Sequence, residues 1–259
     1  MVNSRVGNNG RVDAIDTALG KGLRVLEALA RADGPVRISH LAADLQMQKS
    51  SLHRVLQTLA ELGFVSQDPD TTQYAATLKL WELGSTVAGA VPVKLAAATI
   101  LPELHHTTGE TVSLSVRDGD DVLYLEKITS PRPMGFTTRV GSRVPAPMTA
   151  AGRVMLAYAP DDEAVAVIER VAARVGDGVL DVDRARADLR KARRDGYLVG
   201  RGRTDRGIVG IATAVRRSTG EPVAGVTVST PAQRLDRDRQ DAIVEALLVA
   251  AARIGEAIR

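Results

Sequence analysis

Side chains able to form hydrogen bonds recur at helical spacing along one side of residues 49–62. At about 100° per residue, the apolar side chains of this segment fall on one helix face and the polar ones on the other. The apolar face comprises Leu52, Val55, Leu56, Leu59 and Leu62. The polar face comprises Ser50, Ser51, His53, Arg54, Gln57 and Thr58, and Lys49 precedes it. Side chains of these types contact phosphates and base edges in a DNA groove, and the free N–H groups of a helix N-terminus favour phosphate. We therefore predict a DNA-binding surface here, although a solvated amphipathic helix remains the alternative.

The elements expected on either side of this helix favour DNA binding. The expected order is helices near residues 19–30, 38–45 and 50–62, then short strands at residues 64–66 and 74–75. Ser39 is placed to cap the second helix, and Gly63 to end the third. Three close helices followed by a hairpin are typical of a winged helix-turn-helix domain, and the hairpin would bring residues 71–73 near the DNA backbone or minor groove.

The remainder of the chain predicts a domain of mixed helices and strands. Helices are expected at residues 78–83, 93–108, 149–159, 161–171, 183–195 and 236–258. Strands are expected at residues 111–116, 122–128, 136–140, 208–215 and 223–228. Because hairpins outnumber strand–helix–strand units, we predict an α+β fold whose antiparallel sheet is flanked by helices.

The composition argues against most enzyme chemistries. Among 259 residues there is no cysteine, and the four histidines all precede residue 107. The larger second domain therefore lacks the residues of a thiolate or histidine metal site and of a Ser-His or Cys-His relay. Carboxylate chemistry stays open, but we expect no enzyme, no metal and no cofactor. No apolar run approaches the roughly 20 residues of a membrane span, and we expect a cytoplasmic protein with a flexible arm at residues 1–16.

Ordered motifs in both parts of the chain resemble the IclR family of bacterial transcriptional regulators. The matching segments are residues 18–26, 38–42, 49–56, 62–65, 78–84, 149–153, 196–197 and 224–229. The resemblance implies a winged helix-turn-helix domain at residues 17–77, a linker helix at 78–92 and a GAF-like effector-binding domain at 93–259. It also implies a homodimer or tetramer that represses or activates from a palindromic operator in double-stranded DNA, according to a small metabolite.

The same resemblance implies an effector pocket in the second domain. Its residues would be Thr149, Ala150, Gly152, Thr227 and Ser229, with Met134, Ile208 and Gly210 as walls. Thr227 and Ser229 alternate with valines, so both hydroxyls would lie on one sheet face and suit a small carboxylate or carbonyl. Ordinary outward strand positions are the alternative. Arg201 and Arg203 would favour an anionic effector if they reach the pocket, and otherwise belong to a surface loop.

Two further expectations concern association and a rival function. The apolar residues of 78–83 and the small residues of 87–91 can pack against a second copy, or merely cover their own domain. The rival function is a metabolite-sensing or scaffold protein without specific DNA binding. The intact polar set Ser50, His53, Arg54 and Gln57 argues against it.

Overall fold

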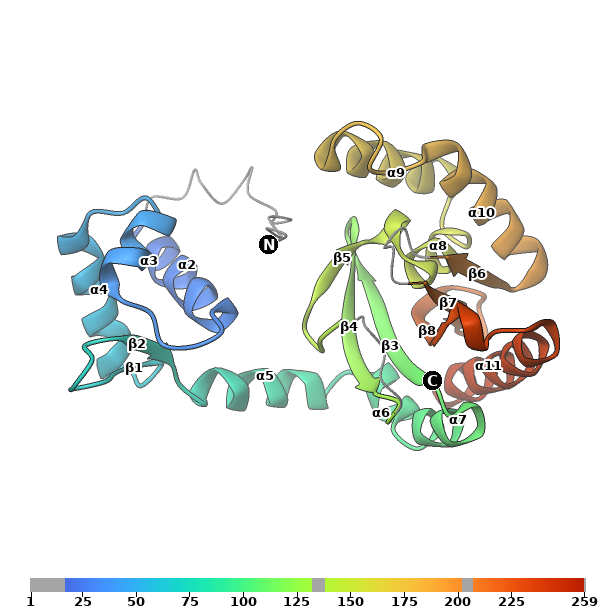
Figure 1. Cartoon of the computed structure of the whole chain (residues 1–259), viewed down its shortest axis with the longest axis horizontal. Helices are drawn as coiled ribbons and strands as arrows, with labels where there is room; N and C mark the ends of the chain where they lie inside the picture. Colours follow the sequence, from blue (N-terminus) through green and yellow to red (C-terminus); the bar gives the residue numbers. More distant parts are fainter. Residues whose placement is uncertain (1–16, 132–137, 202–206, 259) are drawn as a thin grey trace. The chain divides into compact units, whose positions relative to one another are not determined.

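The computed structural model describes residues 17–131, 138–201 and 207–258, without the side chain of Arg201. The chain divides into two compact units between Ala88 and Gly89. Figure 1 shows the first unit in blue to teal and the second in green to red. Each unit has its own apolar core.

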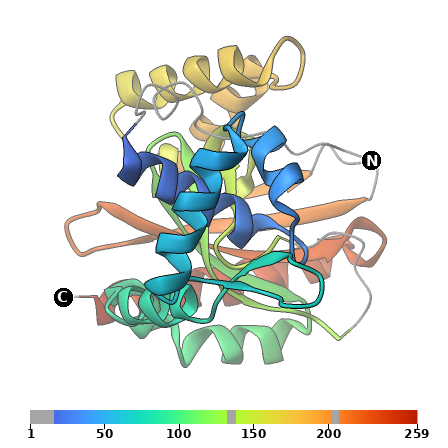
Figure 2. The same cartoon turned by 90° about the vertical axis from the view of Figure 1, so that its left-hand side faces the viewer.

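The first unit consists of helices followed by a hairpin, as predicted. Its elements are α2 (Ala18–Arg31), α3 (Ile38–Asp44), α4 (Lys49–Glu61), β1 (Val65–Gln67) and β2 (Tyr74–Ala76). Figure 2 faces this unit, with its helices in blue to cyan and its hairpin in teal. Val25, Leu41, Leu52 and Leu56 form the centre of its core. Because each helix contributes one apolar stripe, three short helices close around a single cluster.

The ends of these helices follow the predicted signals only in part. Gly63 has φ of 77°, the left-handed conformation that ends α4. Ser39 does not cap α3, because the helix begins at Ile38 and Ser39 lies inside its first turn. The N-cap is Arg37, which makes no side-chain capping bond. The hydrogen bond that caps α2 comes from Thr17, whose hydroxyl accepts from the Gly20 N–H at 3.1 Å.

After β2 the chain enters α5 (Lys79–Gly89), which has no buried residue. Its exposed side chains include Trp81 and Val87, 72% and 70% exposed. A helix with this much exposed apolar surface does not contribute to the core of either unit.

The second unit contains six described strands in one antiparallel sheet, in the order β5-β4-β3-β8-β7-β6. The strands are β3 (Thr111–Asp118), β4 (Asp121–Ile128), β5 (Arg143–Pro145), β6 (Tyr197–Arg201), β7 (Ile208–Arg216) and β8 (Pro222–Pro231). Two short 3-10 helices, η1 (Ala146–Met148) and η2 (Ala232–Arg234), adjoin it. The α+β class with an antiparallel sheet is confirmed.

Helices cover both faces of this sheet (Figure 1). They are α6 (Pro92–Ala97), α7 (Ile100–Thr108), α8 (Ala150–Leu156), α9 (Asp161–Val175), α10 (Val182–Asp195) and α11 (Arg237–Ala257). On one face, Val112, Leu114, Val226 and Val228 pack against α6, α7 and α11. On the other face α8 lies nearest the sheet, and α9 and α10 pack with it. Alternate residues of one strand therefore face two different helical layers.

Three sequence predictions for this unit need correction. The helix predicted over residues 93–108 is two helices, interrupted at residues 98–99. The strand predicted over residues 136–140 is absent from 138–140, and residues 136–137 lie outside the described part. The edge strands β5 and β6 were missed, since β5 spans only three residues and β6 follows a helix without a hairpin signal.

No described helix combines the length and the apolar character that crossing a membrane requires.

Candidate functional site

The polar residues predicted to contact DNA lie together on the outer face of α4. Leu52, Leu56 and Leu59 are buried on the inner face. The outer residues Lys49, Ser50, His53, Arg54, Gln57 and Thr58 are exposed, and Ser51 is half-buried. The N-cap, Gln48, makes no side-chain capping bond, so it leaves the N–H groups of the first turn available to an anion.

The turn between α3 and α4 is held from α2. Arg24 Nη2 donates to the carbonyl oxygen of Leu45 at 3.1 Å, at the end of α3. The next residue, Gln46, has φ of 54°, a conformation that residues other than glycine seldom adopt. The turn that directs α4 is thus fixed by a side chain from a third helix.

The tip of the β1–β2 hairpin is organised by Asp68. One of its oxygens accepts from the Thr71 N–H at 2.7 Å, from the Thr71 hydroxyl at 2.8 Å and from the Asp70 N–H at 3.0 Å. These bonds, chiefly the one from the Thr71 N–H, hold the pKa of Asp68 below its usual value. Because Asp68 and Asp70 are both acidic, this tip lacks the positive charge that attracts DNA phosphates.

The C-terminus of α4 is bound by the start of α5. Lys79 Nζ donates to the carbonyl oxygen of Leu62 at 2.7 Å and lies 4.8 Å from the centre of the Phe64 ring. The Thr77 hydroxyl donates to the carbonyl oxygen of Gly63 at 2.6 Å. A cation at a helix C-terminus is favourable because it satisfies a free carbonyl and complements the helix dipole.

In the second unit, the predicted effector residues gather where α8 meets the sheet. The Thr149 hydroxyl caps α8 by accepting from the Gly152 N–H at 2.8 Å. Ile208, Gly210, Thr227 and Ser229 belong to β7 and β8, with Ser229 directly opposite Gly210. Met134 and Arg203 lie outside the described residues, as does the side chain of Arg201.

Glycines let α8 approach this face of the sheet. A β-carbon on Gly200 would lie 3.0 Å from the Ala150 β-carbon, and one on Gly225 would lie 3.1 Å from the Ala151 β-carbon. Gly210 has more room, since its nearest neighbour, Thr227 Cγ2, would be 3.5 Å away. The start of α8 therefore covers this part of the sheet closely.

Arg153 fixes the loop that precedes α8. Its Nε donates to the carbonyl oxygen of Pro147 at 2.6 Å, and its Nη1 donates to Asp188 Oδ2 at 2.5 Å. Burial lowers the pKa of Arg153, and the neighbouring Asp188 partly offsets this. This side chain joins η1, α8 and α10, so the backbone around Thr149 is held from two sides.

The strand register aligns three polar residues across β4, β3 and β8, next to the residues predicted for the effector pocket. Lys127 of β4 pairs with Ser113 of β3, and Ser113 pairs with Thr227 of β8. Their neighbours Val112 and Val228 face the other helical layer, so Ser113 and Thr227 face α8. Neither Ser113 nor Lys127 was among the residues predicted for the effector pocket. The alternation of small polar residues in β3 is a signal for Ser113, whereas Lys127 joins the row only through the register.

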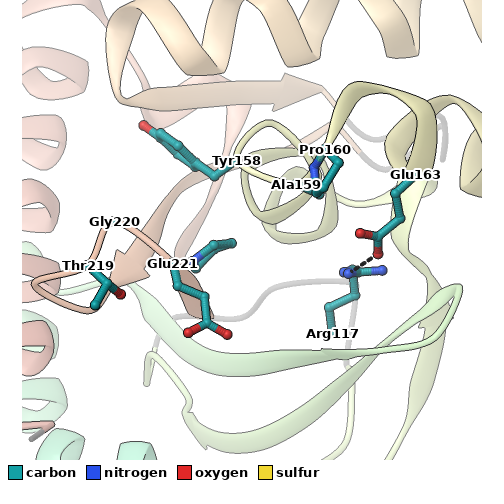
Figure 3. Close-up of a pocket in the computed structure, with 9 residues that line it drawn as sticks. Arg117, Tyr158, Ala159, Pro160, Glu163, Thr219, Gly220 and Glu221 are labelled. Carbon is teal, nitrogen blue, oxygen red and sulfur yellow. Dashed lines mark hydrogen bonds and ion pairs between the residues drawn. The ribbon is translucent and has the colours of Figure 1, made fainter.

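Two hollows on the second unit lie elsewhere. The first, of about 560 Å³, lies between the β7–β8 turn and the start of α9, where Arg117 Nη2 points to Glu163 Oε1 at 2.5 Å (Figure 3). The second, of about 630 Å³, lies beside α11 and shares Tyr158 and Gly220 with the first. Neither is lined by any of the predicted effector residues that the structure describes. Within the described ranges no three potential metal ligands cluster.

Comparisons with known proteins agree across both units. The family model described as "Bacterial transcriptional regulator IclR C-terminal" matches residues 85–256, and the model "IclR helix-turn-helix domain" matches residues 18–69. The HTH-type transcriptional regulator KdgR of Escherichia coli is 31% identical over 244 residues, covering 93% of this chain and 92% of its own length. Relatives are named as transcriptional regulators or repressors, in agreement with the expectation that the chain is not an enzyme.

Solved structures give the same result. The Thermotoga maritima IclR structure has a TM-score of 0.75 at 27% identity and covers 92% of this chain and 96% of its own. An IclR homologue from Microbacterium hydrocarbonoxydans, complexed with 4-hydroxybenzoate, has a TM-score of 0.81 at 25% identity and covers 94% of this chain and 99% of its own.

Proposed function

Since this chain belongs to the IclR family of bacterial transcriptional regulators, we propose that it binds a palindromic operator as a homo-oligomer and responds to a small metabolite. The observation that carries this proposal is the outer face of α4, where hydrogen-bonding and basic side chains lie exposed above a buried leucine stripe. Because its operator lies in the bacterial chromosome, we infer that it acts in the cytoplasm.

The DNA-contacting residues form two groups, one that contacts phosphates and one that contacts base edges. Lys49, Ser50 and Ser51 lie in the first turn of α4 and contact phosphates, where the helix dipole adds to the attraction. His53, Arg54, Gln57 and Thr58 extend along the groove and read base edges. The acidic tip at Asp68 and Asp70 gives the hairpin a weaker part in this attraction, so that α4 carries most of the affinity.

The second copy is supported by exposed apolar side chains on the first unit. These are Leu19 and Leu23 of α2, Leu78 before α5, and Trp81 and Val87 of α5. Apolar surface of this extent favours association, since covering it removes it from water. A twofold pair of α4 helices then requires a palindromic operator.

The effector site lies between the start of α8 and the sheet. Thr149, Ala150 and Gly152 form its α8 side, and Thr227 and Ser229 form its floor with Gly210 and Ile208; Met134 and Arg201 complete the set. The complex of a relative with 4-hydroxybenzoate supports a small acid as the ligand class. Coupling between such a site and DNA is worth about 1–3 kcal/mol, so operator affinity would change about 5- to 150-fold.

Selection of genomic DNA fragments by the full-length protein, at one stated near-physiological salt concentration, tests the proposal. Recovery of one palindromic site supports a specific regulator, and the neighbouring genes suggest metabolites to test. Binding that is strongly salt-sensitive and blind to sequence contradicts a specific operator. Absence of binding favours a sensor or scaffold protein.

A further inference from the structure

Lys127 is a half-buried cation on the face of the sheet that α8 covers. Its Nζ donates to the carbonyl oxygen of Thr138 at 2.8 Å, and no carboxylate of the described residues pairs with it. The adjacent Glu126 carboxylate belongs to the other face, where its Oε2 lies 3.5 Å from Lys94 Nζ of α6. An ammonium group has three N–H donors, so the contact with Thr138 leaves two of them to other acceptors.

Hydroxyl groups extend from Lys127 across the neighbouring strands. Ser113 lies beside it in β3, and Thr227 lies beside Ser113 in β8. Ser229 is two residues further along β8 on the same face. Ser113 and Thr227 are only 5% and 8% exposed. Unlike the Thr111 hydroxyl, which accepts from the Ser130 N–H, none of these three hydroxyls bonds to another described residue.

The packing of α8 limits where a ligand can lie on this face. Over β6, Ala150 leaves no room for a ligand, since even a β-carbon on Gly200 would be only 3.0 Å from the Ala150 β-carbon. A β-carbon on Gly225 of β8 would likewise lie 3.1 Å from the Ala151 β-carbon, so the row from Thr227 through Ser113 to Lys127 is the part of this face without a glycine contact to α8. Since strands are about 4.8 Å apart, Thr227 and Lys127 are separated by about 10 Å, the length of a small organic acid.

We propose that Lys127, with Ser113, belongs to the effector site and selects an effector that carries a carboxylate. This inference rests on the effector site proposed above and adds its charge partner. The carboxylate binds Lys127 Nζ and the Ser113 hydroxyl, and the remainder of the effector extends towards Thr227 and Ser229. Burial also lowers the pKa of Lys127, because desolvation disfavours its charged form.

Binding of matched acids and amides to the full-length protein tests the inference. The probes are acetate, succinate, benzoate and 4-hydroxybenzoate. To these are added the acids metabolised by enzymes encoded beside the recovered operator, and the amide of each acid. We expect at least one acid, and not its amide, to raise the Tm in a concentration-dependent way. Lys127→Met weakens that binding about 10- to 100-fold, Lys127→Arg weakens it less, and Ser113→Ala costs about 3- to 10-fold.

A second lysine provides the matched control. Lys94 is partly buried and belongs to the same unit, but it pairs with Glu126 and lies on the opposite side of the sheet. Lys94→Met leaves binding of the acid unchanged. The Tm of Lys127→Met without ligand stays at or above that of the wild type, since the substitution removes a half-buried charge that no described carboxylate compensates. A lysine with a purely structural role would instead lower it.

Each remaining outcome contradicts the inference. Equal binding of the acid by the wild type and Lys127→Met excludes Lys127 from the effector site. If Thr227→Val or Ser229→Val abolishes that binding, the effector site proposed above is still supported. Binding of amides alone, or of no acid at about 10 mM, excludes a carboxylate-selective site. Operator selection is measured separately, so loss of this inference leaves the DNA-binding proposal intact.

Discussion

At Gly152 the first turn of α8 lies directly against the carbonyl group of Ala146. A β-carbon on Gly152 would be 2.1 Å from the Ala146 oxygen and 2.5 Å from its carbonyl carbon. The same glycine donates its N–H to the Thr149 hydroxyl. Because the atoms that a β-carbon would meet are backbone atoms of Ala146 and not the end of a flexible side chain, they cannot move aside easily to admit it.

Gly152→Ala is expected to destabilise the protein by about 2–4 kcal/mol, as overpacking against backbone does. Urea unfolding measures this change. Gly22→Ala is the matched control, since a β-carbon there meets nothing within 4 Å. In the interior of α2 that substitution should stabilise by about 0.5–1 kcal/mol. Equal effects of the two substitutions would contradict the packing described for α8.

Glu110→Gln is expected to cost about 3 kcal/mol of stability. Glu110 is fully buried, and its two oxygens accept from Arg234 Nη2 at 2.8 Å and Arg239 Nη2 at 3.0 Å. Loss of the carboxylate leaves two partly buried guanidinium groups without their counter-charge. Glu103→Gln is the control, because Glu103 also pairs with an arginine of α11 but at an exposed position. Little change is expected there, and an equal loss in both variants would show that burial is not the cause.

Arg54→Ala is expected to weaken operator binding by about 1–3 kcal/mol without lowering the Tm. Arg54 is exposed on α4, so its removal disturbs no core contact. Arg31→Ala removes another exposed arginine from the same unit, one that pairs with Glu27. Its operator affinity should stay near that of the wild type. Titration of both variants against the selected DNA site measures the difference, and equal affinities would remove Arg54 from the contact surface.

Trp81→Glu is expected to convert the wild-type oligomer to smaller species at micromolar concentration. The indole is 72% exposed on α5, and a carboxylate placed in an apolar contact loses its hydration. Sedimentation velocity measures the assembly. Val249→Glu, which alters an exposed apolar residue of α11, should sediment as the wild type does. A wild-type monomer would contradict the proposed association directly.

Acid should weaken the link between the β3–β4 turn and α9. Arg170 donates to Asp120 from Nη2 at 2.6 Å and from Nε at 3.1 Å, and these bonds hold the pKa of Asp120 below its usual value of 3.8. A carboxyl with a lowered folded-state pKa contributes stability that is present above the unfolded-state pKa and is lost as the pH falls through the folded-state pKa. The Tm difference between the wild type and Asp120→Asn should therefore shrink below about pH 4. A constant difference would contradict this.

The sequence predicted the first unit more fully than the second, because its signals are local. The leucine spacing of α4 and the glycine at residue 63 act within one or two helix turns. The predicted DNA-contact residues therefore lie on one face of α4, exposed except for the half-buried Ser51, whereas their role stays a prediction. The prediction at Ser39 was wrong because the N-cap of α3 is Arg37, two residues earlier, and a capping signal alone does not locate a helix end to within one or two residues.

The second unit depended on pairing between distant segments. The β3–β4 and β7–β8 hairpins were predicted from their turns, but the pairing of β3 with β8 joins residues more than a hundred positions apart. The neighbourhood of Lys127, Ser113 and Thr227 follows from that pairing. Composition and residue spacing do not reveal this pairing of strands. The sequence alone therefore did not indicate which hydroxyl groups lie beside Lys127.

The contact of Lys79 with the end of α4 affects how the protein can be divided for study. A fragment that stops at Thr77 keeps α2, α3 and α4 but loses the ammonium that binds the Leu62 carbonyl and covers Phe64. Its α4 should fray from the C-terminal end, and hydrogen exchange there should be faster than in the whole chain. A fragment that continues through Gly89 keeps this contact. The smallest fragment that preserves the C-terminus of α4 therefore extends into α5.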